Sequence, residues 1–267
     1  MQQSSVPKIV VGIPAYNEEK TIGGIVRRVR ALGLVEDVVV VDDGSSDDTA
    51  AVAEAAGASV LRHKTNIGAG GATRTCFDAA RKRGATLLVT LDGDGQHNPD
   101  EIPDVIAPIL NNGADIVIGS RFLKIDNEVP LHRSLGIRFI TFLCNLGSKA
   151  RVTDAQSGFR AYGEETLQCL TIMDRGFGFS IETLIQARQK GLTIAEVPVS
   201  CIYNSASHTR SPLVHGPIVA VSVLKYRTRG FLRIPTNGNG NGNGHGASDH
   251  ALPTGSVPEA EGRAANS

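Results

Sequence analysis

Short apolar runs alternate with helical segments over the first 120 residues, and no other feature limits the possible fold as strongly. The helical segments have about 10 to 15 residues each, a length that connects neighbouring strands of a parallel sheet. The pattern therefore predicts an α/β fold with a mostly parallel central sheet and helices on both faces. The expected strands are residues 6–13, 37–41, 59–61, 86–91 and 115–118.

Acidic residues directly follow two of these expected strands. Asp92-Gly93-Asp94 comes after the fourth run, and an acidic cluster at 42–47 comes after the second. Ligands of a parallel sheet bind beyond the carboxyl ends of its strands, where both clusters fall. Carboxylates separated by glycine can converge on Mg²⁺ or Mn²⁺, which is usually completed by water and substrate phosphates. A solvated turn uses the same residue types, so the motif alone leaves both interpretations open.

The pattern changes after Arg121. We expect helices at 131–150, 164–170 and 180–190, and strands at 158–162 and 193–199. From Pro235 the chain reads NGNGNGNGHG, followed by a segment rich in Ala, Ser, Pro and Glu, which cannot bury enough apolar surface to fold. We therefore predict one domain over 1–234, with halves at 6–120 and 121–234, and a disordered low-complexity tail over 235–267.

Charge is unevenly distributed, although the formal net charge is zero. Residues 1–120 contain 11 Lys and Arg against 16 Asp and Glu, whereas residues 201–235 contain five basic residues and no acidic one. This asymmetry suits a protein in which a metal site adjoins a surface that binds anions. The alternative is that the charged residues are scattered by chance over a solvated surface. Nucleic acid is not an expected partner.

The cysteines and the hydropathy pattern favour a cytoplasmic protein. The four cysteines are far apart and form no CxxC motif, which argues against a zinc site or a disulfide framework. The N-terminus lacks the apolar core of a signal peptide, and no stretch of about 18 apolar residues could span a membrane.

Six segments carry a resemblance to a known family. They occur in the order found in the inverting glycosyltransferases of family 2, which have the GT-A fold. Within that family the chain looks most like the enzymes that transfer mannose or glucose to dolichyl or polyprenyl phosphate, and the resemblance covers residues 8–200. The segments are VGIPAYNEE at 11–19, VVDDGSSDDT at 40–49, NIGAGGATRT at 66–75, LDGDGQHNP at 91–99, GSR at 119–121 and SGFRAY at 157–162.

The resemblance implies a pocket for the base and ribose of a GDP- or UDP-sugar. Pro14, Tyr16 and Glu18 would line it. Tyr16 can stack on a base, and Glu18 can accept a hydrogen bond from a ribose hydroxyl. The alternative interpretation is an exposed loop aromatic and a carboxylate favoured at the start of a helix.

Further residues of the family motifs would act on the nucleotide or support it. Asp42 would contact the nucleotide, whereas Asp43 and Asp47 would stabilise the turn and the following helix. His208 and Arg210 lie in a segment that could cover the donor, where some related transferases place a basic residue against the diphosphate.

The resemblance assigns the metal to the acidic turn after the fourth strand. Asp92 and Asp94 resemble the DxD motif, and Gln96 would supply a further oxygen to Mg²⁺ or Mn²⁺. Asp92 could instead lie closer to the nucleotide than to the metal. The ion would stabilise the departing nucleoside diphosphate.

A glycine-rich segment departs from the family pattern. Ala69 stands where these enzymes more often have lysine, so a phosphate contact through that side chain is not expected. Gly68, Gly70 and Gly71 permit close backbone approach or positive φ, and a structural loop is the favoured interpretation.

The acceptor would be an anion held by arginines. A phosphate monoester can attack without a general base, but it needs cations to bind and align it. The resemblance assigns this role to Arg121 and Arg133, with Arg138 and Arg160 behind them. For each arginine the alternative is a surface ion pair or a side chain that covers apolar surface.

Glu182 lies in a segment whose glutamate is near the active centre in relatives. With a phosphate acceptor, Glu182 would orient an arginine. With a sugar hydroxyl as acceptor, Glu182 or Asp154 would be the general base.

Two segments combine apolar side chains with arginine and lysine, namely 131–150 and 216–233. This composition is typical of helices that lie in the headgroup plane of a membrane. An ordinary core-packing helix, or a dimer contact at 216–233, is the alternative. We expect peripheral binding at the cytoplasmic face.

The sequence thus implies metal-dependent inverting transfer of a hexose from a GDP- or UDP-sugar to a polyprenyl phosphate. One alternative is a GT-A glycosyltransferase that acts on a sugar hydroxyl. Another is a nucleotide-sugar-binding module without transfer activity.

Overall fold

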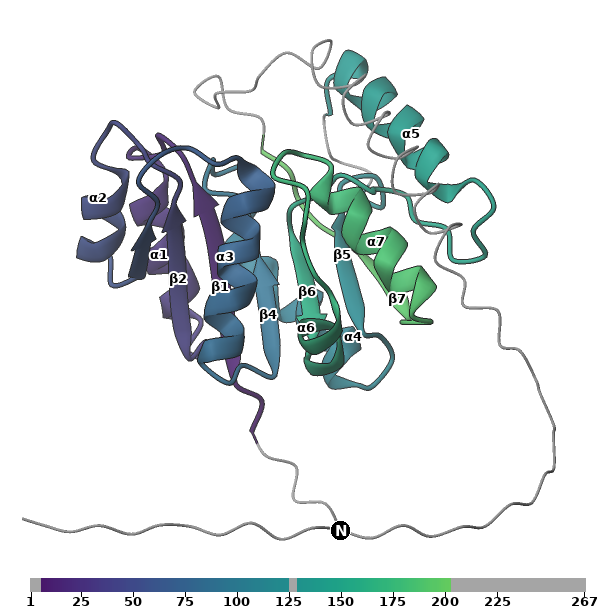
Figure 1. Cartoon of the computed structure of the whole chain (residues 1–267), viewed down its shortest axis with the longest axis horizontal. Coiled ribbons are helices and arrows are strands. Elements are labelled where there is room, and N and C mark those ends of the chain that lie inside the picture. Colours follow the sequence, from purple (N-terminus) through teal and green to yellow (C-terminus); the bar gives the residue numbers. More distant parts are fainter. Residues whose placement is uncertain (1–5, 125–128, 203–267) are drawn as a thin grey trace, which may run out of the picture. The chain divides into compact units, whose positions relative to one another are not determined.

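The computed structural model describes residues 6–124 and 129–202, except the side chains of His132 and Arg133. This part forms a seven-stranded sheet with helices on both faces, which confirms the expected fold class (Figure 1). The strands are β1 Ile9–Ala15, β2 Asp37–Asp42, β3 Ser59–Arg62, β4 Leu87–Thr90, β5 Ile116–Ser120, β6 Arg160–Gly163 and β7 Ile194–Pro198. The helices are α1 Ile22–Ala31, α2 Thr49–Ala55, α3 Ala69–Lys82, the 3₁₀ turn η1 Pro99–Glu101, α4 Ile102–Leu110, α5 Leu131–Asn145, α6 Glu164–Cys169 and α7 Phe179–Gln189.

The strand order is β3-β2-β1-β4-β6-β5-β7. All neighbours are parallel except β6, which runs antiparallel between β4 and β5. The carboxyl ends of β1, β2 and β4 therefore meet at one edge, the upper edge in Figure 1. The register pairs Ala15 with Asp42, so the loops after β1 and β2 begin side by side.

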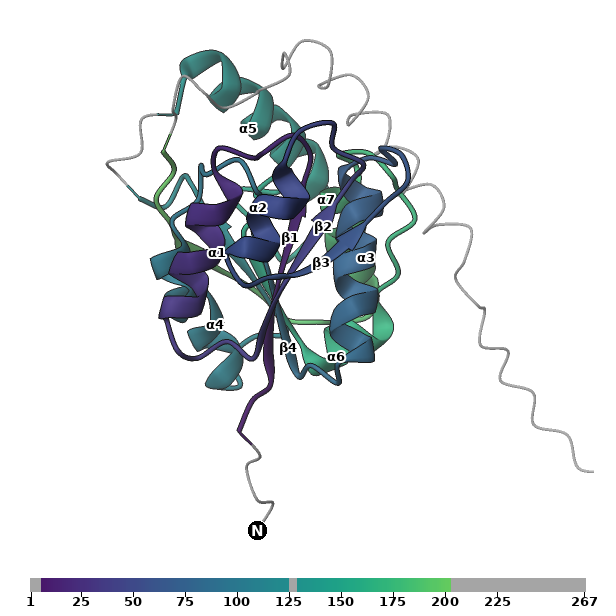
Figure 2. The same cartoon turned by 90° about the vertical axis from the view of Figure 1, so that its left-hand side faces the viewer.

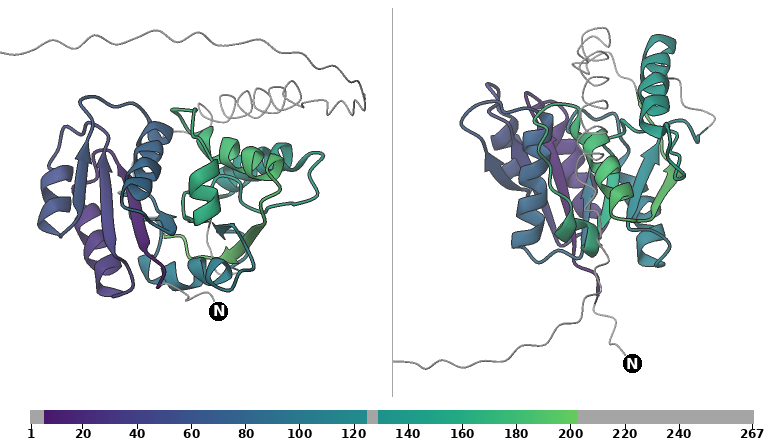
Figure 3. Two further views of the ribbon diagram at one scale, coloured as in Figure 1. Left: turned by 60° about the horizontal axis from the view of Figure 1, so that its bottom comes forward. Right: turned by 45° about the vertical axis from the view of Figure 1, so that its right-hand side comes forward.

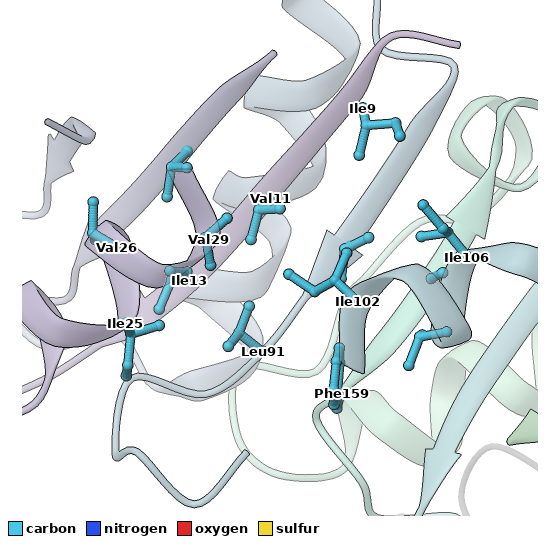
Figure 4. Packing of buried hydrophobic residues seen from close by; sticks show 14 of the residues in the cluster. Ile9, Val11, Ile13, Ile25, Val26, Val29, Leu91, Ile102, Ile106 and Phe159 are labelled. Carbon is cyan, nitrogen blue, oxygen red and sulfur yellow. The ribbon is translucent and has the colours of Figure 1, made fainter. Parts of the chain in front are cut away.

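The helices form two layers. Helices α1, α2 and α4 cover one face of the sheet, and α3, α6 and α7 cover the other (Figures 2 and 3). In α1 the buried residues Ile22, Ile25, Val26 and Val29 recur at the spacing of one helical face, which is why this helix docks on the sheet. Ile25 packs in the same cluster as residues of β1 and α4 (Figure 4).

Helix α5 lies beyond the end of the sheet rather than against it (Figures 1 and 3). Its buried residues Ile137, Ile140 and Cys144 face the domain, and Ile140 and Cys144 share a cluster with Ile181 and Leu184 of α7. The helix ends at Asn145, earlier than the sequence predicts, and Gly147 then adopts a φ of +67°. Within the described part of the chain, no helix is long and apolar enough to cross a membrane.

The glycine-rich segment has a structural role at the start of α3, where Gly68 precedes the helix and Gly70 and Gly71 lie in its first turn. Gly68 has a φ of +96°, and the amides of Gly70 and Gly71 donate to the Arg175 carbonyl at 3.0 and 3.3 Å. A Cβ atom on Gly70 would overlap the carbonyl oxygen of Asp174. The glycines are therefore needed because two backbones meet here.

Gly70→Ala should lower the free energy of unfolding by about 2 kcal/mol, because the added methyl group meets backbone that cannot yield easily. Gly24→Ala is the matched control, since its Cβ would meet nothing within 4 Å. That substitution in α1 should stabilise the protein by about 0.5–1 kcal/mol. Urea unfolding of both variants measures the difference, and equal midpoints would contradict the packing argument.

Candidate active site

The acidic turn after β4 is fixed against the loop after β1. The carbonyl oxygen of Gly93 accepts a hydrogen bond from Thr21 Oγ1 at 2.6 Å. A Cβ on Gly93 would lie 3.2 Å from Ala15 Cβ and 3.3 Å from the Pro14 carbonyl oxygen. Asp92 and Asp94 therefore flank a glycine that touches the segment predicted to bind the donor.

On one side of this turn, carboxylates crowd together. The pKa of Glu18 is raised to about 7, first by burial and then by the negative charge of Asp94, with smaller contributions from Asp47 and Asp92. A hydrogen bond from Thr21 opposes the rise. Asp94 Oδ1 accepts from the backbone N–H of Gln96 at 3.0 Å. A cation beside Asp94 and Glu18 would relieve the repulsion.

Asp92, the first residue of the turn, lies near basic side chains. Its Oδ2 lies 3.4 Å from Nε2 of His97, and its side chain is 45% exposed. Burial alone would raise the pKa of Asp92, but the hydrogen bond and charge of His97, followed by the charges of Arg121 and Arg160, outweigh it and lower the pKa. The two aspartates of the turn thus have opposite electrostatic environments.

The donor atoms at the turn fit a hard divalent cation only if substrate completes the shell. Among the residues that the structure describes, no group of three His, Cys, Asp or Glu side chains could hold a metal ion by itself. Carboxylate oxygens of Asp94 and Asp92 can supply two ligands, and Mg²⁺ or Mn²⁺ usually takes the rest from water and phosphate. The Gln96 side chain is buried and bonded to Asp94 Oδ2.

Asp42, the last residue of β2, and Asp43, which directly follows it, have different partners. Asp42 is fully buried, accepts from the Ser45 amide at 3.0 Å, and lies 3.0 Å from Nε of Arg62. Its contact with a nucleotide stays a prediction. Asp43 accepts from the amides of Ile67 and Gly68.

Asp47 supports the start of α2. It accepts from the amides of Thr49 and Glu19 at 3.1 and 3.2 Å, so it stabilises the turn as expected. Tyr16 is 39% exposed beside this loop, and Pro14 is partly buried at the end of β1. Both remain available to a donor.

Arg121 is a buried partner of Asp154. Its Nε and Nη2 donate to the two carboxylate oxygens at 2.6 and 2.8 Å, a bidentate pair. Burial favours the neutral acid, but the Arg121 charge outweighs it and lowers the pKa of Asp154. The alternative of a surface ion pair is wrong, because the pair is buried.

Arg160 and Glu182 lie inside the domain. Arg160 is 1% exposed and donates to the carbonyls of Ser157, Ala155 and Ser180 and to Thr183 Oγ1. These contacts correct the expected role of Arg160 as an acceptor-phosphate residue, because its donors are used within the protein. Glu182 accepts from the amides of Met173 and Asp174, both at 2.9 Å, and so holds the loop that meets the glycine-rich segment.

The remaining arginines differ in how far they are described. Arg138 is exposed on α5, with its guanidinium 5.1 Å from the ring centroid of Phe122. Arg133 belongs to α5, but its side chain lies outside the described residues, as do Arg210 and His208. The stretch 216–233 and the tail 235–267 also lie outside them.

Sequence reasoning missed three residues at this site. Thr21 joins the two loops, and His97 and Gly158 contact the Asp92 side chain. Both His97 and Gly158 occur within the motifs that carry the resemblance. The position of His97, three residues after the DxD motif, could have indicated that it lies near Asp92. No local signal shows that Gly158, 66 residues further on, would pack against Asp92.

Comparison with known proteins identifies the family. Residues 10–171 match the profile described as Glycosyl transferase family 2. The chain therefore belongs to glycosyltransferase family 2, and it is a glycosyltransferase with the GT-A fold. Within that family, its resemblance to the polyprenyl-phosphate sugar transferases is confirmed.

Three relatives illustrate the similarity. UDP-N-acetylglucosamine–dolichyl-phosphate N-acetylglucosaminyltransferase of Methanococcus voltae is 37% identical, covering 74% of this chain and 87% of that protein. Undecaprenyl-phosphate mannosyltransferase of Micrococcus luteus is 29% identical, covering 81% and 91%. The structure of glucosyl-3-phosphoglycerate synthase of Mycobacterium tuberculosis, in complex with Mn²⁺, UDP and glucosyl-3-phosphoglycerate, has a TM-score of 0.67 at 26% identity, covering 87% and 82%.

Without metal, Glu18 should make stability fall as pH rises. Its folded pKa of about 7 exceeds the ordinary value of 4.5, so the folded state binds the proton more tightly. The loss begins near pH 4.5 and is complete above about pH 7. Glu18→Gln should remove this contribution, so its melting temperature should exceed that of the wild type above pH 7 and approach it near pH 4.5.

Thermal melts between pH 4.5 and 8 in the presence of a chelator measure this dependence. Glu54→Gln, on the exposed surface of α2, is the control and should follow the wild type. A Glu18→Gln protein whose stability parallels the wild type across the whole range would contradict the crowding of carboxylates at the turn.

Proposed function

We propose that this protein transfers a hexose, with inversion, from a GDP- or UDP-sugar to a polyprenyl phosphate at the cytoplasmic face of a membrane. The observation that carries the proposal is the charge division at the turn after β4. Asp94 and Glu18 form an acidic side, where the charge of Asp94 raises the pKa of Glu18. On the basic side, the positive charge of Arg121 helps to lower the pKa of Asp92. A cation-bound diphosphate suits the first side, and an anionic acceptor suits the second. Relatives named for polyprenyl-phosphate acceptors support this assignment.

The contacts of the two candidate bases favour a phosphate acceptor over a sugar hydroxyl. A hydroxyl needs a general base with an accessible lone pair. Asp154 is fully buried and bonded to Arg121, and Glu182 is 2% exposed and bonded to two backbone amides. A phosphate oxygen is already anionic and needs no base.

In the proposed reaction, Arg121 and Arg133 align the acceptor phosphate, with Arg138 nearby, so that a phosphate oxygen attacks the anomeric carbon opposite the leaving diphosphate. Asp154 holds the Arg121 guanidinium in one orientation, which reduces the entropy lost on binding. Asp94, Asp92 and Gln96 would hold Mg²⁺ or Mn²⁺. When bound, the ion supplies the positive charge that stabilises the leaving nucleoside diphosphate.

Transfer should depend on the acceptor's phosphate. With Mn²⁺ and radiolabelled UDP-glucose, UDP-N-acetylglucosamine or GDP-mannose, we expect one donor to give a labelled lipid with polyprenyl phosphate and none with the matching polyprenol. Asp94→Asn should lower turnover by about 100-fold or more, because stabilisation of the leaving group is lost. Equal transfer to polyprenol or to a free sugar would overturn the proposal.

The outer face of α5 suits a membrane surface. Four large apolar side chains lie on it at spacings of three or four residues, which places them on one helical stripe. They are Leu131 (76% exposed), Leu135 (61%), Phe139 (59%) and Phe142 (59%), and exposed Leu146 (43%) directly follows the helix. Arg138 is exposed on the same helix and can bind anionic headgroups. We propose that α5 lies in the headgroup plane, which would bring Arg121 and Arg133 near a lipid phosphate.

Phe139→Glu with Phe142→Glu should weaken binding to vesicles that contain anionic phospholipid by about tenfold or more, because two aromatic side chains that would insert into the membrane surface are replaced by anions. Leu110→Glu, at the end of α4, is the matched control for an exposed apolar residue (45%) and should bind like the wild type. Co-sedimentation measures the binding. Undiminished binding of the double variant would exclude α5 as the membrane contact.

A further inference from the structure

Gly158 packs directly against the carboxylate of Asp92. A Cβ atom built on Gly158 would overlap both carboxylate oxygens, and its three nearest atoms all belong to Asp92. The Gly158 carbonyl accepts a hydrogen bond from Thr90 Oγ1 at 2.9 Å. Because Thr90 ends the strand that leads into Asp92, this bond fixes Gly158 relative to the carboxylate. Because Gly158 has no side chain, the Asp92 carboxylate can occupy the space beside it in this orientation.

His97 contacts the same carboxylate. Its Nε2 lies 3.4 Å from Asp92 Oδ2, and its ring centroid lies 5.4 Å from that of Phe159. The residue is 5% exposed, and its backbone forms a bridge with Cys201. His97 is therefore held by packing and by backbone pairing, and it can hold Asp92 in turn. Asp92 still keeps 45% of its side chain exposed to a ligand.

We propose that Gly158 and His97 form a socket that fixes the Asp92 carboxylate in the orientation that binds the metal-nucleotide part of the donor. Both are positioning residues that act through Asp92. The inference rests on the proposed function only in taking Asp92 as a donor-binding group. It assigns Gly158 of the SGFR segment to the donor side of the reaction.

Gly158→Ala tests the socket with the smallest possible change, because the three atoms nearest to its added methyl group all belong to Asp92. In calorimetric titrations of the full chain with UDP and with GDP, each with Mn²⁺, we expect Gly158→Ala to weaken the tighter nucleotide by tenfold or more. The unfolding midpoint should stay near that of the wild type. Gly24→Ala, whose Cβ meets nothing, should bind like the wild type.

A double-mutant cycle shows whether the effect passes through Asp92. In an Asp92→Ala background, Gly158→Ala should have no further effect on binding, since the carboxylate it displaces is gone. His97→Phe keeps the ring beside Phe159 but removes the donor, so it should also weaken binding, and His97→Gln should restore part of it.

Wild-type binding by Gly158→Ala, additive losses in the cycle, or equal impairment of His97→Phe and His97→Gln would each overturn the socket. A wild type that binds neither nucleotide with Mn²⁺ would overturn it as well. These titrations contain no acceptor. A failure to glycosylate polyprenyl phosphate would therefore overturn the proposed function and leave the socket standing.

Discussion

Burial of Glu18 beside other carboxylates at the carboxyl edge of the sheet is the constraint on which this site depends. Parallel pairing of β1 with β2 and β4 brings three loops to one place, and acidic residues lie near the start of two of them. Glu18 and Asp94 then meet at a distance where one carboxylate raises the pKa of the other. The fold tolerates this cost where the donor is expected to bring a cation, which is consistent with a site organised for a bound state.

The basic side of the turn is built differently, from buried groups with fixed partners. Arg121 is oriented by Asp154, and Arg160 by carbonyls from two elements. In the proposed reaction, an Arg121 guanidinium held in this way loses less freedom when the acceptor phosphate binds than a mobile surface arginine would lose. The guanidinium of Arg160 stays fixed inside the protein by its own acceptors.

Local features of the sequence were enough for the elements and for the acidic edge. Every expected strand and helix from residue 6 to 202 has a counterpart, because run length, helical spacing and turn residues act within a few positions of one another. The predicted roles of Asp43 and Asp47 in the turn after β2 follow from the same short-range chemistry. The contacts of Arg160 and Glu182 did not follow, because the family motif gives a residue type and leaves its partners open.

The sequence by itself determined the α/β class, the family and the position of the acidic residues at the carboxyl ends of the strands. Each of these depends on patterns that a chain carries locally, whatever its final pairing. Only the tertiary structure decided that β6 enters antiparallel between β4 and β5, pairing Leu88 with Tyr162, and that Gly158 closes on Asp92. Contacts between residues more than 60 positions apart depend on how whole layers pack, and no local pattern encodes that packing.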